Sequence, residues 1–177
     1  MELLDQYAGA SEWTVAKAAV AANHLDAPTP CEGWDVRKLM NHMLQTQQYF
    51  VASARGQEAT PPGGEPPELL SDDPAADFEQ ARTDFLRTFG EDGVVERTGP
   101  VLGIAFADQL LHGWDLARAT DQDATMPERL AEAAYGAIHG KFSDDQRAGT
   151  FGPEILIAEN ASAQDMLLAY TGRDPSR

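Results

Sequence analysis

Apolar residues recur at helical spacing along most of this 177-residue chain, whereas runs of β-branched residues are scarce. In the segment 36–54, for example, Val36, Leu39, Met43 and Phe50 fall on one face of a helix. The pattern predicts an all-α fold. Its helices are expected over about residues 2–22, 36–54, 75–90, 103–120 and 127–140, followed by a short helix that ends near residue 172.

Capping residues mark several ends of these helices. Asp35 is a favourable N-cap for the second helix, because its carboxylate can accept hydrogen bonds from the first free backbone N–H groups. Ser162 and Asp165 form a capping box for the last helix. The sequence predicts an irregular connection over residues 91–103 and a partly extended tail over residues 151–162.

A long connection separates the second and third predicted helices. The stretch from Gly56 to Pro74 contains five prolines and three glycines, so it cannot be helical throughout. A connection of this length can return along the second helix and let the third run parallel to it, as in helical bundles with a long crossover. A mobile lid is the functional alternative for the same segment.

The composition excludes several classes of protein. With 29 Asp and Glu against 13 Lys and Arg, the net charge is −16. Such a surface repels phosphates and anionic lipid heads, so we expect no nucleic-acid or membrane partner. The single cysteine, Cys31, cannot form an intrachain disulfide, and no apolar run reaches the roughly 18 residues that span a bilayer. The amino terminus has no signal-peptide pattern, so we expect a cytoplasmic protein in one domain over residues 1–177.

Three side chains are candidates for metal binding. Asp108 and His112 are four residues apart on an apolar helix and therefore lie on the same face. His42 lies in the middle of the second helix, which a bundle can bring against the same place. Two imidazoles and a carboxylate, with one position left open, are the donor set of a catalytic zinc site. A local charge pair between Asp108 and His112, with a hydrogen-bonded core His42, is the structural alternative.

The blocks "LDAPTPCEGWDVRKLMNHM", "DQLLHGWDLARAT" and "AYTGRDP" resemble the DinB-like metal-binding proteins of mycothiol-producing bacteria. These proteins are relatives of the metal-binding domain of mycothiol-dependent maleylpyruvate isomerase. The resemblance implies a DinB-like four-helix bundle with the long crossover described above, followed here by extra C-terminal helices. It also implies a divalent metal, zinc or nickel, held by His42, Asp108 and His112. The family's acid is commonly Glu, whereas this chain has Asp108, which is one methylene shorter.

The activity that the resemblance implies is a mycothiol-dependent S-transfer or isomerase-like reaction on an electrophilic small molecule. Coordination of a thiol lowers its pKa, so the thiolate is held ready to attack. A metal-dependent hydrolase and a non-enzymatic metal-binding or structural protein are the alternatives. The sequence leaves a monomer and a homodimer equally open.

Neighbouring residues have secondary candidate roles. Asp115 is three residues after His112 and either accepts the free ring N–H of His112 or pairs with Arg118. Gln45 and Thr46 lie one turn beyond His42 and are expected to face the pocket. Cys31 is a candidate redox thiol or nucleophile, but the sequence places no base near it, so we interpret it as a small packed side chain. Lys38 is the one cation on the face of His42. Gly113 is costly in mid-helix unless another backbone or a ligand approaches closely.

Overall fold

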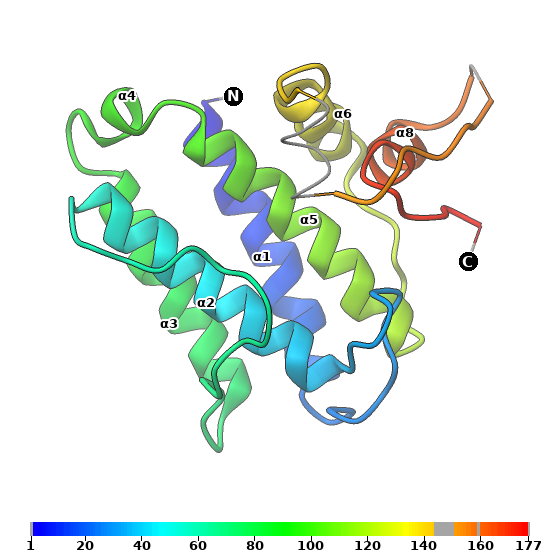
Figure 1. Ribbon diagram of the computed structural model, residues 1–177, viewed down its shortest axis with the longest axis horizontal. Helices are drawn as coiled ribbons and strands as arrows, with labels where there is room; N and C mark the ends of the chain where they lie inside the picture. Colours follow the sequence, from blue (N-terminus) through cyan, green and yellow to red (C-terminus); the bar gives the residue numbers. More distant parts are fainter. Residues whose placement is uncertain (1, 144–150, 159, 177) are drawn as a thin grey trace. The chain divides into compact units, whose positions relative to one another are not determined.

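The computed structural model describes residues 2–143, 151–158 and 160–176. Within these residues the secondary structure is helical, with no strand, which confirms the all-α fold (Figure 1). The helices are α1 (Leu3–Ala21), α2 (Val36–Ala54), α3 (Pro74–Phe89), α4 (Val94–Thr98), α5 (Val101–Ala119), α6 (Glu128–Ile138) and α8 (Ala163–Tyr170). No helix in the described ranges is long and apolar enough to cross a membrane.

The chain divides into two compact units, Met1–Ala124 and Thr125–Arg177. The first contains α1 to α5, and the second contains α6 and α8. The single domain expected from the sequence stays a prediction.

Four helices of the first unit form a closed bundle. α1 packs against α5 and α3, and α2 packs against the same two helices, so each helix has two neighbours in the ring. The large side chains buried at less than 2% exposure include Tyr7, Leu39, Phe78, Phe85, Phe106 and Leu110. The bundle predicted from the sequence is therefore the architecture of this unit.

The crossover between α2 and α3 is also confirmed. It returns along α2, so that α2 and α3 run in the same general direction (Figure 1). Asn41, which is 4% exposed, holds this segment to α2. Its Oδ1 accepts hydrogen bonds from the backbone N–H groups of Leu69 (2.6 Å) and Leu70 (3.0 Å), and its Nδ2 donates to Glu68 Oε1 (2.9 Å). These bonds fix the crossover beside His42, the next residue of α2.

The connection between α3 and α5 differs from the prediction. The passage expected to be irregular contains α4, and α5 begins at Val101, two residues before the predicted start. α4 has five residues between Gly93 and Gly99, which both have positive φ, and it buries Val94. A helix this short is anchored by tertiary packing and leaves almost no periodic signal in the sequence.

A close approach between α1 and α5 explains Gly113. A β-carbon added there would lie 2.6 Å from Thr14 Oγ1 and 2.6 Å from Cζ3 of Trp13. Thr14 Oγ1 also donates a hydrogen bond to the backbone carbonyl of Gln109 at 2.8 Å. A close approach to this glycine was predicted, but side chains of α1 make it, not a backbone or a ligand. It fixes the position of α5 at the residue next to His112.

The second unit contains the predicted cap of its last helix. Ser162 Oγ accepts a hydrogen bond from the backbone N–H of Asp165 at 3.1 Å, which starts α8 as the capping box predicts. α6 ends at Ile138, two residues before the predicted end. The described residues 151–158 form neither helix nor strand.

Candidate metal centre

The acid and the imidazole of α5 meet as their spacing predicts. Asp108 Oδ1 lies 3.3 Å from His112 Nε2, and the two side chains are 21% and 12% exposed. Two donors bound tetrahedrally to one zinc ion are about 3.3 Å apart, since each lies about 2.0–2.1 Å from the metal. The pair on α5 therefore already has the separation that a shared ion requires.

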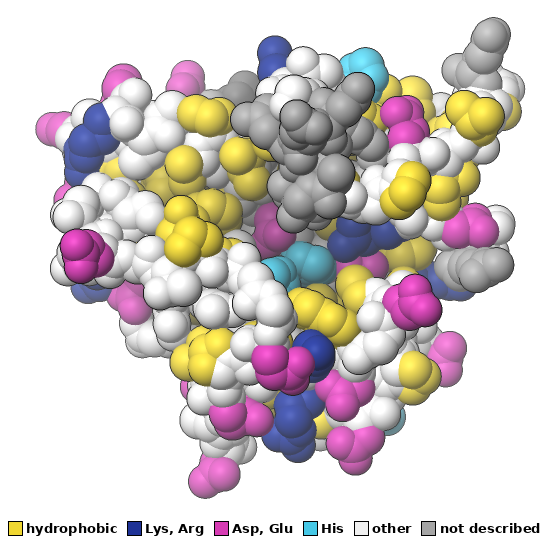
Figure 2. Space-filling model, in the orientation of Figure 1, with side chains coloured by type: hydrophobic (Ala, Val, Ile, Leu, Met, Phe, Trp, Pro, Cys, Tyr) yellow, Lys and Arg dark blue, Asp and Glu magenta, His cyan; other side chains and the backbone are white. Residues whose placement is uncertain are grey.

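His42 comes to the same place from α2. Its ring centroid lies 5.3 Å from that of His112, at an interplanar angle of 84°. His42, Asp108 and His112 each offer one ligand atom, and these three atoms lie within 4.8 Å of one another. Histidine side chains are visible at the centre of the face in Figure 2, beside acidic and apolar side chains. The structure thus brings together the three residues proposed from the sequence, at a site that solvent can reach.

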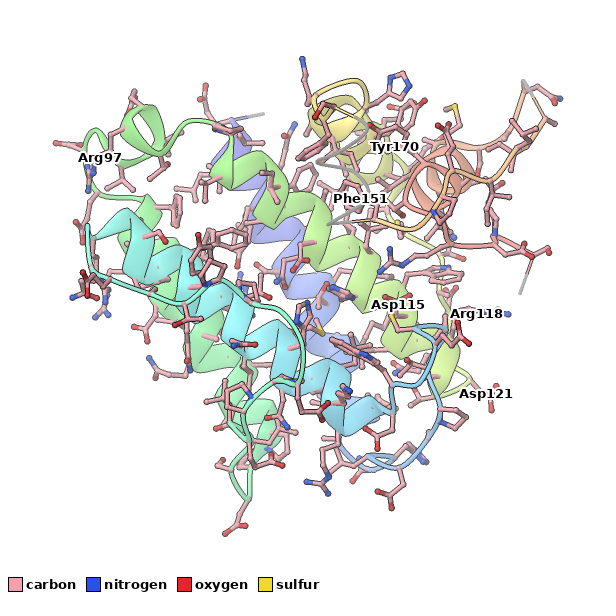
Figure 3. All side chains as sticks on the ribbon, in the orientation of Figure 1. Arg97, Asp115, Arg118, Asp121, Phe151 and Tyr170 are labelled. Carbon is pink, nitrogen blue, oxygen red and sulfur yellow. The ribbon has the colours of Figure 1, made fainter. Side chains whose placement is uncertain are left out.

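Asp115 contacts the other ring nitrogen of His112. Its Oδ2 lies 3.0 Å from His112 Nδ1, and the side chain is completely buried on α5 (Figure 3). This contact confirms the predicted pairing of Asp115 with His112. Because the carboxylate accepts the proton on Nδ1, it sets the tautomer that leaves Nε2 directed at Asp108. Arg118, the other partner considered, lies with its guanidinium carbon 5.9 Å from the Trp114 ring centroid.

Cys31 is the residue that sequence reasoning missed. Its Sγ lies 3.5 Å from Asp115 Oδ2, and Cys31, His112 and Asp115 form a second group of ligand atoms within 4.8 Å of one another. The loop before α2 places it there, because that loop closes with an antiparallel bridge between Pro28 and Asp35. The sequence signal was the "TPCEGW" block itself, one of the motifs that carried the resemblance.

The two histidines have opposite electrostatic environments. Burial, reinforced by the nearby charge of His112, lowers the pKa of His42 from 6.5 to about 4. Burial also acts to lower the pKa of His112, but the charge of Asp108 and hydrogen bonds to Asp108, Asp115 and Cys31 outweigh it and raise that pKa well above 6.5. At neutral pH His42 is therefore uncharged and offers a free lone pair. His112 is protonated, and each of its two ring nitrogens faces a carboxylate.

Lys38 and His139 have partners outside this cluster. Lys38 Nζ forms an ion pair with Glu65 of the crossover and lies 5.1 Å from the Trp34 ring centroid. This pairing offsets the charge of the one cation that the sequence places on the face of His42. His139, in the second unit, stacks on Tyr135 with ring centroids 4.6 Å apart.

The fold and the site together define a helical bundle with a candidate metal centre between α2 and α5. Residues 8–121 match the family described as the mycothiol maleylpyruvate isomerase N-terminal domain, and the chain belongs to this DinB-like family. The matched region contains every residue of the candidate centre.

Two curated proteins are similar to most of the chain. They are the uncharacterized proteins Rv0738 and MT0763 of Mycobacterium tuberculosis, from strains H37Rv and CDC 1551. Each is 28% identical to this chain over 162 residues, which cover 88% of this chain and 88% of the relative. Among solved structures there is no significant match.

The lowered pKa of His42 predicts a specific acid sensitivity of the metal-free protein. The unfolded chain takes up a proton on this ring near pH 6.5, whereas the folded protein does so only near pH 4, so stability is lost as the pH falls between these values. At pH 4.5 this contribution amounts to roughly 2–3 kcal/mol. Urea unfolding after chelator treatment, from pH 7 to pH 4.5, should therefore show a smaller loss of stability for His42→Asn.

The exposed His24 provides the matched control, since His24→Asn leaves the candidate centre intact. Equal acid sensitivity of His42→Asn and the unmodified protein would show that burial does not hold His42 neutral.

Proposed function

We propose that this protein binds one divalent metal ion through His42, Asp108 and His112 and uses it to present mycothiol for an S-transfer or isomerase-like reaction in the cytoplasm. Zinc is the first candidate and nickel the second. The observation that carries the proposal is the convergence of two imidazoles from two helices with a carboxylate, all three ligand atoms within 4.8 Å. Membership of the mycothiol-related family supports the choice of thiol.

The donor set fits such an ion. Two nitrogens and one oxygen would supply three protein ligands and leave a position for a further ligand, which is the donor set of catalytic zinc sites. A bound zinc ion supplies Lewis-acid chemistry that lowers the pKa of a coordinated thiol, which is then held as the thiolate nucleophile.

The side chains of the site have separate tasks. His42 is neutral in the folded protein, so its lone pair is available without loss of a proton. His112 must release a proton before its Nε2 can bind a cation, while Asp115 keeps the ring oriented through Nδ1 at 3.0 Å. Asp108 supplies the anionic donor from the same helix. Cation binding is therefore coupled to proton release.

Metal analysis tests this proposal. Protein incubated with zinc and desalted is expected to retain one equivalent. His112→Ala should retain less than a tenth of that amount, because the ion loses one of its three proposed protein donors. Asp108→Glu, which restores the family's longer acid, keeps the ion, and Asp108→Asn does not. His24→Ala serves as the matched histidine control, and less than half an equivalent in the unmodified protein would contradict the proposal.

Turnover then separates the three functional alternatives. The zinc-loaded protein with mycothiol and 1-chloro-2,4-dinitrobenzene should form the thioether and release chloride in equal amounts, with no product when the thiol is omitted. Hydrolysis of an activated ester without thiol would favour the hydrolase. A metal-loaded protein that accelerates neither reaction would favour a non-enzymatic role.

A further inference from the structure

Two polar atoms on α2, one turn along the helix from His42, have no hydrogen-bond partner within the described part of the chain. They are Thr46 Oγ1 and Gln45 Oε1, and both atoms are buried. Thr46 as a whole is only 4% exposed. A buried hydroxyl or amide oxygen without a partner destabilises a folded protein, so two such atoms on adjacent residues call for an occupant.

Their position on α2 relates them to His42. Thr46 is four residues after His42 and Gln45 is three residues after it, so both lie one turn along the same side of the helix. α2 and α5 run in opposite directions where they pack (Figure 1). Gln45 and Thr46 thus lie on the same side of α2 as His42, one turn further along the helix.

We propose that Gln45 and Thr46 form a hydrogen-bonding subsite for a hydroxyl group of the thiol that binds at the candidate centre. A hydroxyl group can donate to Gln45 Oε1 and accept from the hydroxyl of Thr46, so it satisfies both atoms at once. An ionised carboxylate cannot do so, because it has no proton to donate to the amide oxygen. This inference rests on the proposed function and adds to it the residues that recognise a hydroxyl group of the thiol.

A first test needs neither metal nor thiol. Thr46→Val keeps the shape of the side chain and removes the unpartnered oxygen, so we expect the urea midpoint of the metal-free protein to stay the same or rise. Thr46→Ser, which keeps the hydroxyl, is the control. A clear fall in the midpoint for Thr46→Val beyond that of Thr46→Ser would show that the hydroxyl has a structural role, and it would overturn the subsite.

A second test compares two thiols that differ in hydroxyl groups. Cobalt(II)-loaded protein is titrated with 1-thioglycerol and with 1-propanethiol, and binding is followed by the sulfur-to-cobalt charge-transfer absorption. We expect 1-thioglycerol to bind roughly three- to tenfold more tightly than 1-propanethiol, which is the contribution of about one hydrogen bond. Thr46→Val should abolish this preference, and Thr46→Ser should retain it.

The outcomes separate the two claims. No charge-transfer band with either thiol would contradict the proposed function and the subsite with it. Equal affinity of the unmodified protein for both thiols, or a preference unchanged in Thr46→Val, would overturn the subsite alone and indicate that water satisfies the two atoms. A preference lost in Thr46→Val and kept in Thr46→Ser supports the subsite.

Discussion

His112 lies between two carboxylates of its own helix, and this arrangement requires a positive charge. Asp115 Oδ2 is 3.0 Å from Nδ1 and Asp108 Oδ1 is 3.3 Å from Nε2, at side chains that are mostly or completely buried. Two carboxylates in such surroundings are costly unless a cation compensates them. In the metal-free protein the cation is the proton on His112, whose pKa the carboxylates help to raise. A divalent ion at Nε2 can take over this role on the Asp108 side while Asp115 retains Nδ1–H.

The scaffold fixes the parts of the site independently. Gly113 lets Trp13 and Thr14 of α1 approach α5 directly next to His112, so α1 sets the position of the acid and the imidazole. On the other side, Asn41 binds the backbone of the crossover beside His42. The packing of α2 against α5 then brings the neutral ring of His42 to the charged pair. The centre is thus built on helices, which hold donors more precisely than loops do.

Features that depend on local spacing could be predicted from the sequence. Four- and three-residue intervals on one helix relate His112 to Asp108 and Asp115, and the proline-rich segment required a crossover. The approach of His42 to this pair depends on how α2 and α5 pack, which residue spacing does not determine. Its prediction therefore depended on the family resemblance. The position of Cys31 could not be predicted because it depends on how the loop between α1 and α2 closes. The five residues of α4 were too few for a periodic pattern, and composition gave no sign of the boundary between the two compact units.

His112 belongs to two groups of candidate ligands, one with His42 and Asp108 and one with Cys31 and Asp115. X-ray absorption at the zinc edge of the zinc-loaded protein, without thiol, distinguishes them directly. Binding at His42, Asp108 and His112 predicts imidazole scattering from two rings, only nitrogen or oxygen at about 2.0–2.1 Å, and no sulfur. Addition of mycothiol should then introduce one sulfur at about 2.3 Å. A sulfur neighbour in the thiol-free protein would instead place the ion with Cys31 and Asp115, on the opposite side of His112, and would contradict the assignment of the site.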